Sequence, residues 1–125
     1  MDIAESTSYQ QFLAIDGDRV GETLERLILL EDLAAVRRFS DAVAAAVRTL
    51  KDFLVGQGCD IIFAAGDGLL AASRTVLDLS SITLRHGELT FSIGAASRPA
   101  ESLLALKVAK GLGRCRIIAR GGTST

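Results

Sequence analysis

Residues 61–72 read IIFAAGDGLLAA, and this stretch sets the expected arrangement of the rest of the chain. The apolar runs that flank Gly66, Asp67 and Gly68 are each too short for a helix, so the pattern predicts strand, tight turn, strand. A glycine on either side of Asp67 permits positive φ and close approach of a ligand. The stretch therefore predicts a carboxylate at the tip of a buried hairpin, although Asp67 is also simply a favourable turn residue.

The sequence before the hairpin predicts one strand and two helices. Residues 11–15 (QFLAI) form an apolar run that ends at Asp16, which indicates a buried strand followed by the turn DGDRVG. Helical spacing of apolar residues then predicts a short helix, and Asp32 can cap a longer one that Gly56 ends. The apolar face of the longer helix consists of Leu33, Val36, Phe39, Val43, Val47, Leu50 and Leu54.

After the hairpin we expect a helix, a strand, a second helix and a last strand. Ser73 can cap the first of these helices, which would end near His86. Residues 89–95 alternate between apolar and polar or small, as in a half-buried strand. Pro99 suits a helix start, and residues 115–119 (CRIIA) predict the last strand. The residues expected to face the core from the two helices are Val76, Leu79, Ile82, Leu103 and Leu106.

Length and composition are those of one domain spanning residues 1–125, with an antiparallel-containing sheet and helices on one face. A formal net charge of −1 argues against a general nucleic-acid coat protein and leaves a local nucleotide site open. We expect a cytoplasmic protein, because no membrane-spanning run or signal-peptide pattern is present. Cys59 and Cys115 lack metal-ligand spacing, so free thiols are favoured over a disulfide. The single histidine makes a histidine triad or zinc site improbable.

The candidate metal- and phosphate-binding side chains are two carboxylates and two cations. If their strands are neighbours, Asp16 and Asp67 meet at one sheet edge, where paired oxygen ligands suit Mg²⁺ or Mn²⁺. The Gly17 carbonyl can add an oxygen, and the amides of residues 19–21 at a helix start can bind an anion. Lys110 and Arg114 lie four residues apart at the end of the last helix. They are either ordinary helix-end charges or a clamp for a triphosphate.

The ordered series IDGD (15–18), AAGDG (64–68), FSIGAAS (91–97) and LKVAKGLGRCRII (106–118) resembles the palm-type GGDEF nucleotidyl cyclases. The strongest resemblance is to the minimal CRISPR polymerase (mCpol) group, which is related to the polymerase palm of type III CRISPR effector complexes. This resemblance implies an α+β, ferredoxin-like (βαββαβ) palm, two-metal catalysis and a cyclic nucleotide product. By position, it implies metal binding by Asp16, Asp67 and the Gly17 carbonyl. The nucleotide-binding residues that it implies are Gly17, Asp18, Arg19, Val20, Gly21, Ser40, Gly66, Gly68, Lys110 and Arg114.

The sequence departs from the larger families at three places. Gly68 stands where the larger families have a second acid after Asp67. The accessory role of that acid is therefore in doubt for this chain, whereas metal binding by Asp67 is unaffected. Leu24 and Leu33 stand about where diguanylate cyclases place polar guanine-reading residues, so ATP is favoured over GTP. Ser40 is either a reader of the adenine edge or a tolerated helix serine.

The resulting hypothesis is a Mg²⁺- or Mn²⁺-dependent nucleotidyltransferase that makes a cyclic oligonucleotide, with cyclic di-AMP favoured, from ATP. The resemblance implies a role in antiphage defence, with a downstream effector that responds to the cyclic nucleotide. Because one palm offers one metal site and one triphosphate clamp, we expect a symmetric homodimer. We expect no membrane partner and no sequence-specific nucleic-acid binding. The alternative is a degenerate palm that binds nucleotide and acts by interaction, and Gly68 is its main support.

Overall fold

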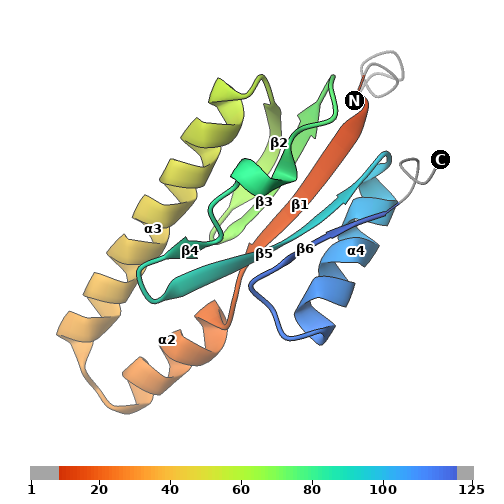
Figure 1. Cartoon of the computed structure of the whole chain (residues 1–125). Helices are drawn as coiled ribbons and strands as arrows, with labels where there is room; N and C mark the ends of the chain where they lie inside the picture. Colours follow the sequence, from red (N-terminus) through yellow and green to blue (C-terminus); the bar gives the residue numbers. More distant parts are fainter. Residues whose placement is uncertain (1–8, 121–125) are drawn as a thin grey trace.

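A computed structural model describes residues 9–120, which build one mixed, mostly antiparallel sheet flanked by helices (Figure 1). The strand order is β2–β3–β1–β5, and β4 and β6 both pair with β5. Only the β5–β6 pair is parallel. The predicted α+β, palm-like fold is confirmed. The strands are β1 (Gln11–Gly17), β2 (Asp60–Ala65), β3 (Gly68–Ser73), β4 (Arg85–His86), β5 (Leu89–Ala96) and β6 (Ile117–Ala119).

The β2–β3 hairpin is present, and Gly66 takes the positive φ of 57° that the turn requires. Of the two hairpin strands, however, only β3 is buried. β2 is an edge strand with largely exposed side chains, so the prediction of a buried hairpin is wrong for this half. The reason is its position, because among residues 9–120 no strand pairs with β2 on its outer side.

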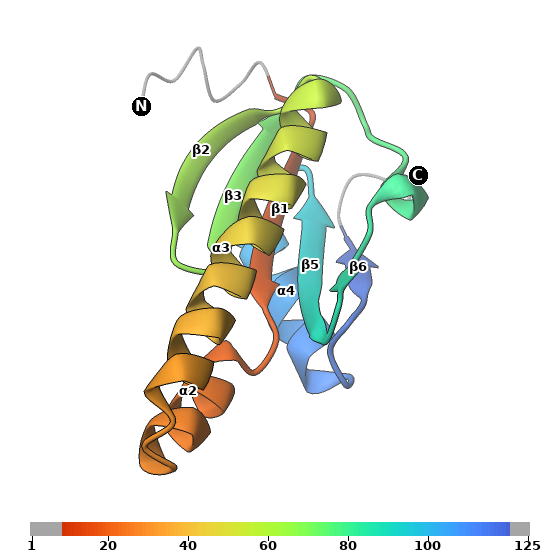
Figure 2. The same ribbon diagram turned by 90° about the vertical axis from the view of Figure 1, so that its left-hand side faces the viewer.

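Helices α2 (Val20–Leu29) and α3 (Leu33–Gly56) follow β1, and the predicted cap is confirmed because the Asp32 side chain accepts a 3.0 Å hydrogen bond from the Ala35 amide. Only the C-terminal half of α3 is buried, where Leu50 and Leu54 pack against the sheet. Leu33 lies on the same apolar stripe but is 66% exposed. Figure 2 shows the reason, because α2 and the first turns of α3 project beyond the end of the sheet.

Helix α4 (Pro99–Gly111) covers the opposite face of the sheet from α3, so the expectation of helices on one face is wrong (Figure 2). Gly94 allows this close packing. A methyl group there would lie 2.1 Å from the backbone oxygen of Ser102 in α4. β5 is consequently buried on both faces, which corrects the prediction of a half-buried strand.

The helix predicted after Ser73 does not form. Residues 74–88 contain only a 3₁₀ turn, η1 (Leu79–Ser81), and the short β4. The Asp78 carboxylate accepts hydrogen bonds from both the amide and the hydroxyl of Ser80, a local pattern that competes with helix. The Leu77 amide donates to the side-chain oxygen of Gln11 and ties this segment to β1.

Within residues 9–120, no helix has the length and apolar character needed to cross a membrane. Cys59 and Cys115 are both free thiols, as expected.

Candidate functional site

Asp16 and Asp67 meet at one end of the sheet. Asp16 lies near the end of β1 opposite Gly68, and the Gly17 amide donates a 3.1 Å hydrogen bond to the Asp67 carbonyl. A methyl group at Gly17 would lie 3.0 Å from Oδ2 of Asp67, so that carboxylate rests directly over the glycine. Burial first, and then the negative charge of Asp67, raise the pKa of Asp16. The two carboxylates therefore share one small volume.

The donor set in this volume fits a hard divalent cation. Within the described part of the chain, no group of three His, Cys, Asp or Glu side chains is placed to hold a metal. The site instead offers two carboxylates next to the Gly17 backbone oxygen. Magnesium commonly binds through one or two carboxylates and takes substrate phosphates and water as its other ligands. Asp16, Asp67 and Gly17 are thus the residues that would hold Mg²⁺ or Mn²⁺.

Lys110 reaches into the same volume from α4. Its Nζ lies 3.3 Å from Oδ2 of Asp16 and donates a 2.8 Å hydrogen bond to the Gly17 carbonyl oxygen. It also donates to Oδ1 of Asp18 at 2.9 Å. The side chain of Lys110 is only 21% exposed. One ammonium group therefore joins the last helix to the end of β1.

Asp18 lies in a buried network beside the two other acids. Its carboxylate accepts hydrogen bonds from the Thr90 and Ser92 hydroxyls at 2.6 and 2.8 Å, and from the Cys115 amide at 3.0 Å. Burial alone would raise the pKa of Asp18, but the hydrogen bonds from Thr90, Lys110, Ser92 and the Cys115 amide hold it below its usual range. All these partners are protein groups, so this carboxylate anchors the chain after β1 to β5 and to the segment after α4.

A cleft of about 590 Å³ opens over the two carboxylates. Four cations line it, and one of them, Arg114, has a left-handed backbone with φ of 68°. Among residues 9–120, its Nε is the one buried side-chain nitrogen or oxygen without a hydrogen-bond partner. The start of α2 adds backbone amides that have no partner within the helix. The residues that line the cleft are Asp16, Gly17, Arg19, Val20, Gly21, Glu22, Asp67, Lys107, Lys110 and Arg114.

A second, smaller pocket of about 250 Å³ adjoins this cleft, and both are lined by Val20 and Asp67. It is apolar apart from the Ser40 hydroxyl and the hairpin tip, which suits a flat heteroaromatic ring joined to a phosphate chain in the cleft. The residues that line it are Val20, Leu24, Phe39, Ser40, Val43, Ala44, Gly66 and Asp67.

The structure brings most of the predicted site residues together in these two cavities. Asp18 lies in the buried network, and Gly68 lines a separate groove on the α4 side of the sheet. Sequence reasoning missed Lys107, which lines the cleft beside Lys110. Lys107 lies three residues before Lys110, so both side chains lie on one side of α4. This spacing could have identified Lys107 from the sequence.

A comparison with curated proteins found no match. A family model described as minimal CRISPR polymerase domain (mCpol) matches residues 12–120. The matched segment contains every residue of the carboxylate site, the cleft and the adjoining pocket. The chain therefore belongs to the mCpol family, and this membership indicates a polymerase- or cyclase-like nucleotidyltransferase domain.

Proposed function

We propose that this protein joins ATP molecules into a cyclic oligonucleotide, with cyclic di-AMP as the favoured product. The observation that supports the proposal is the convergence of Asp16, Asp67 and four cations on one cleft that adjoins an apolar pocket. Paired carboxylates suit a metal–phosphate complex, the cations suit a triphosphate, and the pocket suits the base.

In the proposed reaction, a ribose hydroxyl of one nucleotide attacks the α-phosphate of another. A new phosphorus–oxygen bond forms, the bond to pyrophosphate breaks, and the hydroxyl proton passes to water. Mg²⁺ held by Asp16 and Asp67 would lower the pKa of the hydroxyl and offset charge on the phosphates. Lys110 and Arg114 would hold the leaving pyrophosphate, where fixed cations oppose its growing negative charge.

Adenine is favoured because the adjoining pocket presents leucine and phenylalanine side chains and a single side-chain hydroxyl, that of Ser40. An apolar pocket rejects a base only weakly unless its polar groups are left unpaired, so this preference is expected to be moderate. A role in antiphage defence, with a separate effector that responds to the product, follows from the family resemblance and is part of the proposal.

We also propose that two copies cooperate in ring closure. Each chain offers one triphosphate cleft, and closing a ring requires attack on a second α-phosphate. A symmetric dimer with opposed carboxylate pairs supplies the second cleft. Mixing Asp67→Asn chains with wild-type chains should then lower the activity per wild-type subunit. Activity strictly proportional to wild-type subunits, or full activity of a demonstrated monomer, would refute the dimer.

The test of the main proposal is incubation of the purified protein with each nucleoside triphosphate and Mg²⁺ or Mn²⁺, followed by mass spectrometry. The expected result is pyrophosphate together with a cyclic adenosine dinucleotide. Binding of ATP without any phosphodiester product, under either metal, would favour the degenerate palm that acts by interaction. The observation that favours this alternative is Gly68, which stands where the larger families have a second acid after Asp67.

A further inference from the structure

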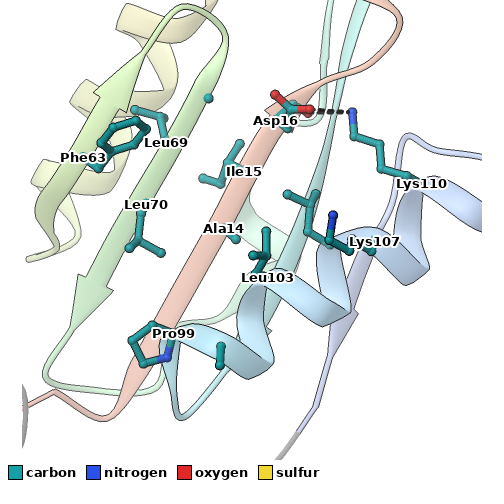
Figure 3. Close-up of a pocket in the computed structure, with 13 residues that line it drawn as sticks. Ala14, Ile15, Asp16, Phe63, Leu69, Leu70, Pro99, Leu103, Lys107 and Lys110 are labelled. Atoms are coloured by element: carbon teal, nitrogen blue, oxygen red, sulfur yellow. Dashed lines mark hydrogen bonds and ion pairs between the residues drawn. The ribbon is translucent and has the colours of Figure 1, made fainter.

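A groove of about 580 Å³ lies on the α4 side of the sheet and ends at Asp16 (Figure 3). Its floor is the surface of β1 and β3, where Ala14 pairs in register with Leu70 and Asp16 pairs with Gly68. Phe63 of the edge strand β2 forms one wall, and α4 forms the other. The groove exists because α4 covers β5 and β1 and leaves β3 and β2 open on this face (Figure 3).

The groove explains two exposed apolar side chains. Leu103 was expected in the core but is 49% exposed, because it stands on the α4 wall of the groove. Phe63 is 58% exposed on the opposite wall. The floor between them is apolar. Ala14 and Gly68 present little or no side chain there, and Leu70 adds an aliphatic one. An apolar slot with an exposed aromatic ring at its side suits a planar base, which can stack on that ring.

The polar end of the groove is continuous with the triphosphate cleft. Asp16, Lys107 and Lys110 line both cavities. Lys107 is exposed and lies along α4 between the apolar wall and the carboxylates. A ligand in the groove would therefore have an apolar body over β1 and β3 and an anionic group beside Lys107. This is the charge and shape pattern of a nucleotide.

We propose that this groove is the binding site for the second nucleotide, the one whose ribose hydroxyl attacks. The inference rests on the proposed nucleotidyltransferase function and adds where the acceptor lies. The donor occupies the base pocket between α2 and α3 and the cleft, on one side of Asp16. The acceptor base occupies the groove on the other side of Asp16, with its phosphate near Lys107. The hydroxyl between them then faces the carboxylates from the side opposite the base pocket.

With the acceptor in the groove, the first phosphodiester bond can form within one chain. It is compatible with the proposed dimer, because the triphosphate of the acceptor still requires a second cleft before the ring can close. A dimer alone, with both nucleotides in base pockets, gives the groove no ligand. The two ideas therefore make separate predictions for variants of the groove.

The primary test is binding of AMP to protein already saturated with α,β-methylene-ATP and Mg²⁺, measured by calorimetry. The analogue fills the base pocket and cleft and cannot transfer, so AMP reports only a second site. The matched pair Leu103→Gln and Leu104→Gln changes neighbouring leucines that are each 49% exposed, of which only Leu103 lines the groove. We expect Leu103→Gln to weaken AMP binding about fivefold or more and Leu104→Gln to leave it unchanged.

Two further variants test the orientation of the ligand. Phe63→Ala should weaken binding of both AMP and adenosine by about 5- to 100-fold through lost stacking. Lys107→Ala should weaken AMP but not adenosine, because only AMP carries the phosphate. Equal effects of Lys107→Ala on both ligands would overturn the assigned orientation.

The outcomes separate the inference from the proposed function. If wild-type protein makes product but AMP does not bind the saturated protein, or binds Leu103→Gln and Leu104→Gln alike, the groove assignment is wrong and the function stands. If AMP binding depends on Leu103 but no triphosphate yields pyrophosphate, the function fails while the groove remains a nucleotide site. Light scattering on the same variants completes the test. Loss of a dimer in Leu103→Gln with unchanged AMP binding would make the groove an interface between copies and overturn the assignment.

Discussion

The ammonium group of Lys110 donates a hydrogen bond of 2.8 Å to the carbonyl oxygen of Gly17, the backbone oxygen expected to assist a metal ion. The same nitrogen lies 3.3 Å from Oδ2 of Asp16. A protein cation thus contacts two of the three groups proposed as metal ligands. A divalent cation that enters the site meets this positive charge, whereas a bound triphosphate is attracted by it.

Lys110→Met should therefore change metal and nucleotide affinity in opposite directions. Without nucleotide, Mn²⁺ should bind about fivefold more tightly, because about 1 kcal/mol of repulsion between charges a few ångströms apart is removed. ATP should bind more weakly. Electron paramagnetic resonance of free Mn²⁺ and calorimetry with ATP measure the two affinities. Lys51→Met, on α3 away from the site, is the control. Weaker Mn²⁺ binding in Lys110→Met would contradict the assigned metal position.

Asp16→Asn and Asp67→Asn should each reduce product formation by about 100-fold or more, because a neutral amide of the same shape is a poor ligand for Mg²⁺. Circular dichroism should remain that of the wild type. Asp41→Asn, which changes an exposed carboxylate on α3, is the matched control and should stay active. Wild-type turnover in either of the first two variants would remove that residue from the metal site.

Asp18→Asn should behave mainly as a stability variant. Replacing one carboxylate oxygen by an amide nitrogen sets a donor against the donors on that side, either Ser92 and Lys110 or Thr90 and the Cys115 amide. A buried charged hydrogen-bond network of this kind contributes about 2–3 kcal/mol. The unfolding free energy from urea denaturation should fall by about that amount. Asp16→Asn, whose carboxyl is 42% exposed, should lose less than about 1 kcal/mol. An equal loss in both would contradict this division of roles.

Gly94→Ala should destabilise the fold through α4. The added methyl group would lie 2.1 Å from the Ser102 backbone oxygen and 2.2 Å from the Leu106 amide, so the helix must move away from β5. The expected cost is about 3 kcal/mol, at the upper end for overpacking, measured by thermal unfolding. Gly111→Ala, in the same helix, meets no atom within 4 Å. It should be neutral or stabilising by about 0.5 kcal/mol.

Tyr9→Phe should raise the pKa of Asp60. The Tyr9 hydroxyl donates to this exposed carboxylate at 2.5 Å and Arg74 pairs with it at 2.9 Å. The hydrogen bond from Tyr9, followed by the hydrogen bond and the charge of Arg74, holds the pKa of Asp60 below the usual range. Because the pKa of Asp60 is lower in the folded state, its interactions contribute to the free energy of unfolding above the unfolded-state pKa of about 4. This contribution is lost as the pH falls through the folded-state pKa. NMR titration of Asp60 should show an upward shift of its pKa in Tyr9→Phe and also in Arg74→Gln, and an unchanged pKa in Tyr9→Phe would contradict the assigned role of the hydroxyl.

Local sequence patterns determined much of this structure. Apolar runs and glycines defined β1, β3 and the hairpin turn, because short-range backbone preferences act there without help from distant residues. Asp32 and Pro99 marked helix starts correctly for the same reason. The meeting of Asp16 and Asp67 could also be predicted from the sequence, because each lies at the end of a predicted strand and β1 and β3 are neighbours in the sheet. The family resemblance rested on the order of short motifs along the chain, and the family match over residues 12–120 confirmed it.

Only the tertiary structure decided which faces the helices cover and how the polar groups are shared. The clash that a side chain at Gly94 would cause is invisible in the sequence, yet it is the absence of that side chain that lets α4 pack across β5 opposite α3. That placement exposes Leu103 to a groove and brings Lys110 to Gly17 and Asp18. The helix predicted after Ser73 failed because hydrogen bonds to Asp78 and Gln11 outweighed a weak apolar period. Burial and long-range hydrogen bonds depend on residues far apart in the chain, so local spacing determines the elements, and the packing of the whole molecule determines which side chains meet.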